Sequence, residues 1–79
     1  MTPEHRILEV LGRAEGELYG LDLVAAGVAK SRGLYVLLGR MEDRGLIEGR
    51  EDGGVPMPRR LYRITDAGRA MLLPVAKVR

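Results

Sequence analysis

The segment from Lys30 to Ile47 places the strongest constraint on how this chain of 79 residues can fold. Its apolar residues recur at the i, i+3, i+4, i+7 spacing of one helical face, at Leu34, Leu37, Leu38 and Met41. Ser31 can cap the start of such a helix, and Gly45 can adopt the left-handed conformation that ends one. The segment therefore predicts a helix over about residues 31–44 that buries one side and exposes the other.

The exposed side of this predicted helix carries basic and small residues. At 100° per residue, the side opposite the stripe holds Arg32, Val36, Gly39 and Asp43, flanked by Tyr35 and Arg40. Such a surface suits a helix that enters the major groove of DNA, although many ordinary surface helices share it. Gly33 and Gly39 would let the helix approach a groove closely, but packing or simple tolerance explains them equally well.

Two further helices are predicted before this segment. Thr2 can cap a helix over residues 3–14, with Pro3 at its first position. Residues 18–19 form a very short strand or an extended link, and a second helix runs from Gly20 to Gly27 or Ala29. Two helices joined by a few residues fit either a helix-turn-helix or a generic helical bundle.

A predicted β-hairpin decides between these alternatives. Residues 46–51 and 61–65 are typical of strands, and residues 52–58 between them are dense in turn formers. Tyr62 and Ile64 fall on one face of the second strand, and Tyr62 is expected in the core. A hairpin directly after the exposed basic helix is a wing, so the predicted fold is α+β, mostly α, a single winged helix-turn-helix domain over residues 1–79.

A short final helix is predicted from the cap at Thr65, and Pro74 limits how far it can continue. Because a core of this size supplies little net stability, a homodimer is expected. The predicted dimer interface is the apolar side of the final helix together with one residue of the first, namely Val10, Ala67, Ala70, Met71, Val75 and Val78.

The charges are unevenly distributed along the chain. Residues 1–29 hold five acids and two arginines, whereas residues 30–79 hold eleven Lys or Arg and six acids. Arg59, Arg60 and Arg63 lie on or beside the wing, where they could meet a phosphate backbone or a minor groove. A basic half that begins at the exposed helix points to nucleic acid, although a solvated surface explains the charge as well.

Other functional classes have little support in the sequence. The chain has no cysteine and one histidine, His5, so neither a metal site nor a nucleophile–histidine pair is expected. Gly53 and Gly54 lack the Lys-Ser/Thr that completes a phosphate-binding loop. No apolar run approaches a membrane span, and residues 1–6 are unlike a signal peptide. The expectation is a cytoplasmic protein with no enzymatic activity, no cofactor and no membrane contact.

Three blocks resemble the PadR family of winged-helix transcriptional regulators: LYGLDL at residues 18–23, YVLLGRMEDRGLI at residues 35–47 and RRLYRITDAGR at residues 59–69. The resemblance implies a regulator of transcription that binds duplex DNA, with repression favoured over activation. The residues nearest DNA would be Arg32, Gly33, Tyr35, Val36, Arg40, Arg59, Arg60 and Arg63.

The resemblance has two departures. Residues 31–35 are one residue shorter than the family's Ser-x-Gly-Thr-hydrophobic-Tyr block. The family's first contacts with DNA bases therefore cannot be assigned to residues of this chain. Family members commonly dimerise through long C-terminal helices, and some bind aromatic effectors between subunits. Only about fourteen residues follow Thr65, which gives an effector little support. A protein–protein interaction module, with the acidic half as its working face, and an RNA-binding winged helix are the alternatives.

Overall fold

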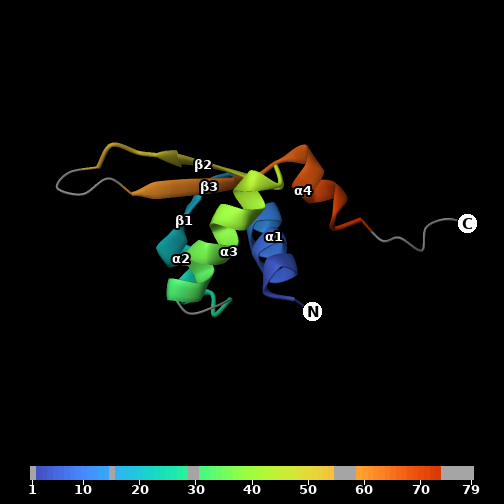
Figure 1. The fold of residues 1–79 in the computed structure, drawn as a ribbon, viewed down its shortest axis with the longest axis horizontal. Helices are drawn as coiled ribbons and strands as arrows, with labels where there is room; N and C mark the ends of the chain where they lie inside the picture. The colour runs from blue at the N-terminus through green and yellow to red at the C-terminus, as the bar shows by residue number, and fades with distance from the viewer. Residues whose placement is uncertain (1, 15, 29–30, 55–58, 74–79) are drawn as a thin grey trace, which may run out of the picture.

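The predicted winged helix-turn-helix architecture is confirmed by a computed structural model, which describes residues 2–14, 16–28, 31–54 and 59–73, without the side chain of Ser31. Its elements are α1 (Pro3–Ala14), β1 (Leu18–Tyr19), α2 (Gly20–Ala25), α3 (Ser31–Asp43), β2 (Ile47–Glu51), β3 (Arg60–Ile64) and α4 (Asp66–Ala70). Helices α1, α2 and α3 lie on one side of a small sheet, and the β2–β3 ribbon extends beyond them as the wing (Figure 1). α4 lies at the opposite end of the sheet from the wing.

The sheet has three antiparallel strands in the order β1-β3-β2. Residues 18–19 are therefore a strand, one of the two possibilities left open by the sequence, and Leu18 pairs with Tyr62 of β3. In the wing, Ile47 pairs with Ile64 and Gly49 with Tyr62. Because side chains alternate along a strand, this register turns Tyr62 and Ile64 toward the helices, and both are buried as predicted.

The core is formed where the three helices meet the sheet. Its buried residues are Ile7, Leu8, Leu11, Leu23, Leu34, Leu38, Met41, Leu46, Ile47, Tyr62 and Ile64. Leu37 of the predicted stripe is only partly buried against this cluster. No polar or charged side chain is buried in the described part of the chain. The core therefore depends on apolar contact alone, and the polar residues remain at the surface.

Two glycines end the second and third helices. α2 stops at Ala25, earlier than predicted, because Gly27 has a φ of 76° and the N–H of Val28 turns back to the Leu23 carbonyl at 3.3 Å. α3 ends as predicted at Gly45, which also has a φ of 76°. There the next N–H, that of Leu46, donates to the Met41 carbonyl at 3.0 Å, so the chain leaves α3 directly into β2.

The corner between β3 and α4 ties the end of the chain to the start of the wing. The Thr65 hydroxyl accepts from the N–H of Gly68 at 3.1 Å, as the predicted cap, and donates to the Gly45 carbonyl at 2.7 Å. A Cβ at Gly68 would collide with the Leu46 carbonyl oxygen. Only glycine lets α4 pack this closely on the α3–β2 junction.

The final helix is shorter than the dimer prediction required. α4 ends at Ala70, and the N–H groups of residues 71–73 bond to carbonyls three residues back, as in a tight last turn. A proline at position 74 would clash with the Ala70 carbonyl in a continuing α-helix, which gives a physical reason for the early end. Val75 and Val78 lie outside the described residues. No described helix combines the length and apolar character needed to cross a membrane.

Candidate nucleic-acid interface

The exposed side of α3, called the α3 front below, is partly basic and carries two glycines, which add no side-chain bulk. It consists of Arg32, Gly33, Val36, Gly39, Arg40 and, at the helix end, Asp43, all exposed. A Cβ built on Gly33 or Gly39 would have no described atom within 4 Å. Packing therefore does not explain either glycine, and the backbone of α3 is open to a close partner at both positions.

The two arginines of the α3 front are available for an external partner. Among the described residues, neither Arg32 nor Arg40 has a carboxylate at ion-pair distance. The arginines near the sheet are different, because Arg50, Arg60 and Arg63 each pair with a glutamate. The positive charge of the α3 front is thus not neutralised by a neighbour in the described part of the chain.

Tyr35 has a packing role that was not apparent from the sequence. It lies on the flank of α3 and is 45% exposed, but its ring covers the first residue of α2. A Cβ at Gly20 would lie 2.5 Å from the Tyr35 Oη and 2.7 Å from its Cε1. A larger residue at position 20 would require the Tyr35 ring to shift, and only part of Tyr35 remains open to a partner.

Arg60 joins the wing to α3. Its Nη2 lies 2.8 Å from the Glu42 Oε2, and its guanidinium lies 5.7 Å from the centre of the Tyr62 ring. Gly49 makes room for this pair, since a Cβ there would lie 2.5 Å from the Arg60 Nη2 and 2.7 Å from the Glu42 Oε2. The ion pair links the start of β3 to the end of α3, and the prediction of Arg60 as a binding residue did not include Glu42 or Gly49.

Arg59 lies where the hairpin leaves the sheet, in a cluster with Tyr19 and Asp52. The Tyr19 hydroxyl donates to the Asp52 Oδ2 at 2.7 Å, while the Asp52 Oδ1 accepts from the N–H groups of Gly54 at 2.9 Å and Arg59 at 3.2 Å. The Arg59 guanidinium lies 5.2 Å from the centre of the Tyr19 ring. These contacts close the two ends of the wing loop on β1.

The hydrogen bond between Tyr19 and Asp52 shifts the pKa values of the two side chains in opposite directions. It lowers the pKa of the Asp52 carboxyl, and the backbone N–H groups of Gly54 and Arg59 add to that shift. The same bond raises the pKa of the Tyr19 phenol, because the phenol must keep its proton to donate. The cluster therefore persists over the whole pH range between these two titrations.

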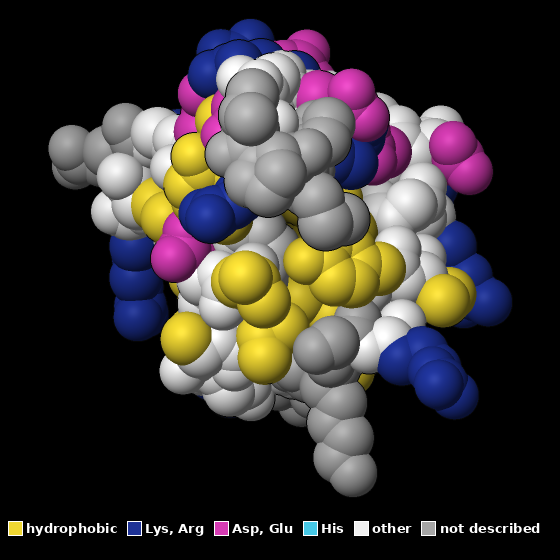
Figure 2. All heavy atoms as spheres, turned by 90° about the vertical axis from the view of Figure 1, so that its left-hand side faces the viewer, with side chains coloured by type: hydrophobic (Ala, Val, Ile, Leu, Met, Phe, Trp, Pro, Cys, Tyr) yellow, Lys and Arg dark blue, Asp and Glu magenta, His cyan; other side chains and the backbone are white. Residues whose placement is uncertain are grey.

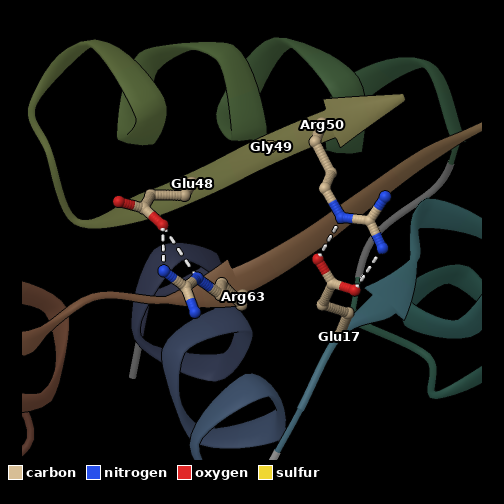
Figure 3. Close-up of a pocket in the computed structure, with 5 residues that line it drawn as sticks. All are labelled: Glu17, Glu48, Gly49, Arg50 and Arg63. Atoms are coloured by element: carbon tan, nitrogen blue, oxygen red, sulfur yellow. Dashed lines mark hydrogen bonds and ion pairs between the residues drawn. The ribbon is translucent and has the colours of Figure 1, made fainter. Parts of the chain in front are cut away.

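Arg63 lies on the face of the sheet that points away from the helices. It alternates with Tyr62 and Ile64, and its Nη2 lies 2.7 Å from the Glu48 Oε1. Figure 3 shows this pair in a shallow pocket, beside a bidentate ion pair between Arg50 and Glu17. The two N···O distances of the Arg50–Glu17 pair are 2.6 and 2.7 Å. Arg60 is thus tied to α3 through Glu42, whereas Arg63 lies on the opposite face of the sheet and is paired with Glu48.

The predicted dimer residues are only partly available. Val10 is half-buried and packs against the core, whereas Ala67, Ala70 and Met71 are exposed at the end remote from the wing. Val75 and Val78 fall outside the described residues. In the described ranges, no group of three His, Cys, Asp or Glu residues could hold a metal ion.

Solved structures of several regulators share this fold. *Bacillus subtilis* PadR in complex with operator DNA matches with a TM-score of 0.77 and 25% identity, over 96% of this chain and 51% of that one. A PadR family transcriptional regulator from *Eggerthella lenta* matches with a TM-score of 0.71 and 34% identity, over 84% and 63%. A PadR family regulator from *Clostridium difficile* matches in fold, with a TM-score of 0.74 and 22% identity, over 89% and 78%.

The chain therefore spans less than two thirds of the first two of these proteins. No curated protein sequence matches the chain significantly. A family model described as "Transcriptional regulator PadR-like family" matches residues 7–73, which include every described element except the first turn of α1. This chain belongs to the PadR-like family of transcriptional regulators.

Proposed function

We propose that this protein is a sequence-specific regulator that binds duplex DNA, and that it acts as a repressor in the cytoplasm. In this proposal α3 enters the major groove, and the wing contacts the backbone or the minor groove with Arg59 and Arg60. The observation that carries it is the α3 front, where, among the described residues, Arg32 and Arg40 have no carboxylate partner and two glycines are open. The complex of *B. subtilis* PadR with operator DNA supports it through the shared fold.

Arg63 is left out of the proposed DNA contacts. It lies on the opposite face of the sheet from Tyr62 and is already paired with Glu48. Tyr35 is kept as a partial contact, because its ring covers Gly20. Enzymatic activity is not proposed, since the family consists of transcriptional regulators.

A homodimer is also proposed, because two copies would place two α3 helices on successive half-sites of one duplex. Met71 is exposed beside α4, and Ala67 and Ala70 line the same exposed end. Sedimentation at micromolar concentration should therefore give a dimer, and Met71→Glu should shift it toward the monomer. A monomer at every concentration, both free and on DNA, would reject this part of the proposal.

The test of DNA binding is selection of bound duplexes from a random pool, followed by titrations of the selected and a scrambled duplex. If α3 reads bases, Arg32→Ala should cost about 1–3 kcal/mol on the selected duplex and relax the preference at one position of each half-site. Arg59→Ala and Arg60→Ala should weaken both duplexes about equally and lower the log–log salt slope by about one each.

The three substitutions serve as controls for one another. None of these side chains is buried in the core, so the variants should unfold at close to the wild-type temperature. If wing variants change the sequence preference while Arg32→Ala acts uniformly, the roles of helix and wing are reversed. If no duplex is enriched and none of the three matters, the chain is better explained as a protein-interaction module.

A further inference from the structure

Val36 is an exposed apolar side chain that takes no part in the core formed by the described residues. It is 53% exposed in the middle of α3, although a β-branched residue is a weak helix former. Tyr35, also exposed, is explained by its contact with Gly20, but Val36 is absent from the core and from the residues packed against it. Stability alone therefore gives no reason for a valine at this position.

The neighbours of Val36 make it a single apolar contact between two cations. On a helix surface the nearest residues are three and four positions away, which here are Arg32, Gly33, Gly39 and Arg40. Both glycines have open space where a Cβ would be. The two methyl groups of Val36 consequently project beyond the neighbouring Gly33 and Gly39, and an arginine lies one helical turn away on each side.

The end of the molecule that includes the start of α3 also exposes apolar side chains. Hydrophobic side chains gather on the end of the molecule formed by α2, the start of α3 and the wing, with basic side chains at the edges (Figure 2). Leu21 of α2 is a second exposed apolar residue of this region, at 61%.

In a duplex, the major groove offers one apolar group at the base edges, the C5 methyl of a pyrimidine, and the O6 and N7 acceptors of guanine suit arginine. We propose that Val36 is a specificity-determining residue that packs on a pyrimidine C5 methyl in each half-site, with Arg32 and Arg40 contacting the base pairs or phosphates on either side. The proposal rests on the proposed function, because it requires α3 to lie in the major groove.

The test removes the methyl from the DNA and the valine from the protein in combination. Each thymine of the selected duplex is replaced in turn by deoxyuridine, which lacks only the C5 methyl. One thymine per half-site should then bind about fourfold more weakly, as expected for burial of one methyl group. In Val36→Ala the same exchange should have almost no effect, so the two changes should not be additive.

Two controls make the result specific. Leu21→Ala removes an exposed apolar side chain outside α3 and should leave the loss on deoxyuridine exchange at about fourfold. Alanine is a better helix former than valine, so Val36→Ala should remain folded, as circular dichroism would check. Selection from an unmodified pool and from the same pool methylated at CG steps distinguishes thymine from 5-methylcytosine as the source of the methyl.

Three outcomes would overturn the inference. If deoxyuridine binds as well as thymine at every position, and methylation at CG steps enriches no duplex, no methyl is read. If the loss persists undiminished in Val36→Ala, or disappears equally in Leu21→Ala, Val36 is not the residue that reads it. If the protein binds no duplex at all, the proposed function itself fails, and this inference fails with it.

Discussion

Replacing Gly39 with alanine should separate what α3 contributes to folding from what it contributes to DNA binding. Gly39 lies inside α3, and a Cβ there would have no described atom within 4 Å. Alanine is favoured over glycine in a helix interior by about 0.5–1 kcal/mol, so the variant should be more stable than the wild type. For a domain of this size, that gain corresponds to a melting temperature higher by roughly 2–8 °C.

The same methyl group should weaken binding to DNA. It adds bulk to the α3 front where the backbone is open, so it would hold the helix away from the base edges. We expect a loss of about 1–3 kcal/mol on the selected duplex, the size of one disturbed base-pair contact. Thermal unfolding by circular dichroism measures the first effect, and titration of a labelled duplex measures the second.

Gly68→Ala is the matched control, because it makes the same chemical change in a crowded place. The new Cβ would collide with the Leu46 carbonyl oxygen and lie 2.8 Å from the Ile64 Cγ1. Overpacking of this kind should destabilise the fold by about 1–3 kcal/mol. The reasoning would be refuted if Gly39→Ala lowered the melting temperature. If that variant gained stability and bound DNA unchanged, α3 would not approach DNA at Gly39.

Two further predictions concern the wing. Glu42→Gln removes the ion-pair partner of Arg60 and should raise the affinity for any duplex by up to about fivefold. Glu48→Gln makes the same charge change on the far face of the sheet and should raise the affinity less, as parallel titrations would show. The Tyr19–Asp52 bond should weaken as pH rises through the raised pKa of the Tyr19 phenol, or falls through the lowered pKa of the Asp52 carboxyl. In Asp52→Asn the Tyr19 signal should titrate at a lower pH by NMR, and an unchanged titration would contradict the assigned bond.

Local patterns in the sequence determined the elements whose interactions span a few residues. The apolar stripe and Gly45 predicted α3 to within a residue, and Thr65 predicted the start of α4, because periodicity and capping depend on neighbours within one or two turns. The alternation in β3 likewise identified Tyr62 as a core residue. The exposed α3 front could be listed from the same helical geometry.

Only the tertiary structure decided the contacts between distant segments. Its strand pairing showed that β1 completes the sheet beside β3, and the ion pairs showed that Arg60 contacts α3 whereas Arg63 contacts β2. The ion pair between Glu42 and Arg60 joins residues 18 positions apart, and the contact between Tyr35 and Gly20 joins residues 15 positions apart. No local sequence pattern predicts either contact. Such partners depend on how helices and strands pack in three dimensions, which periodicity along one segment does not determine.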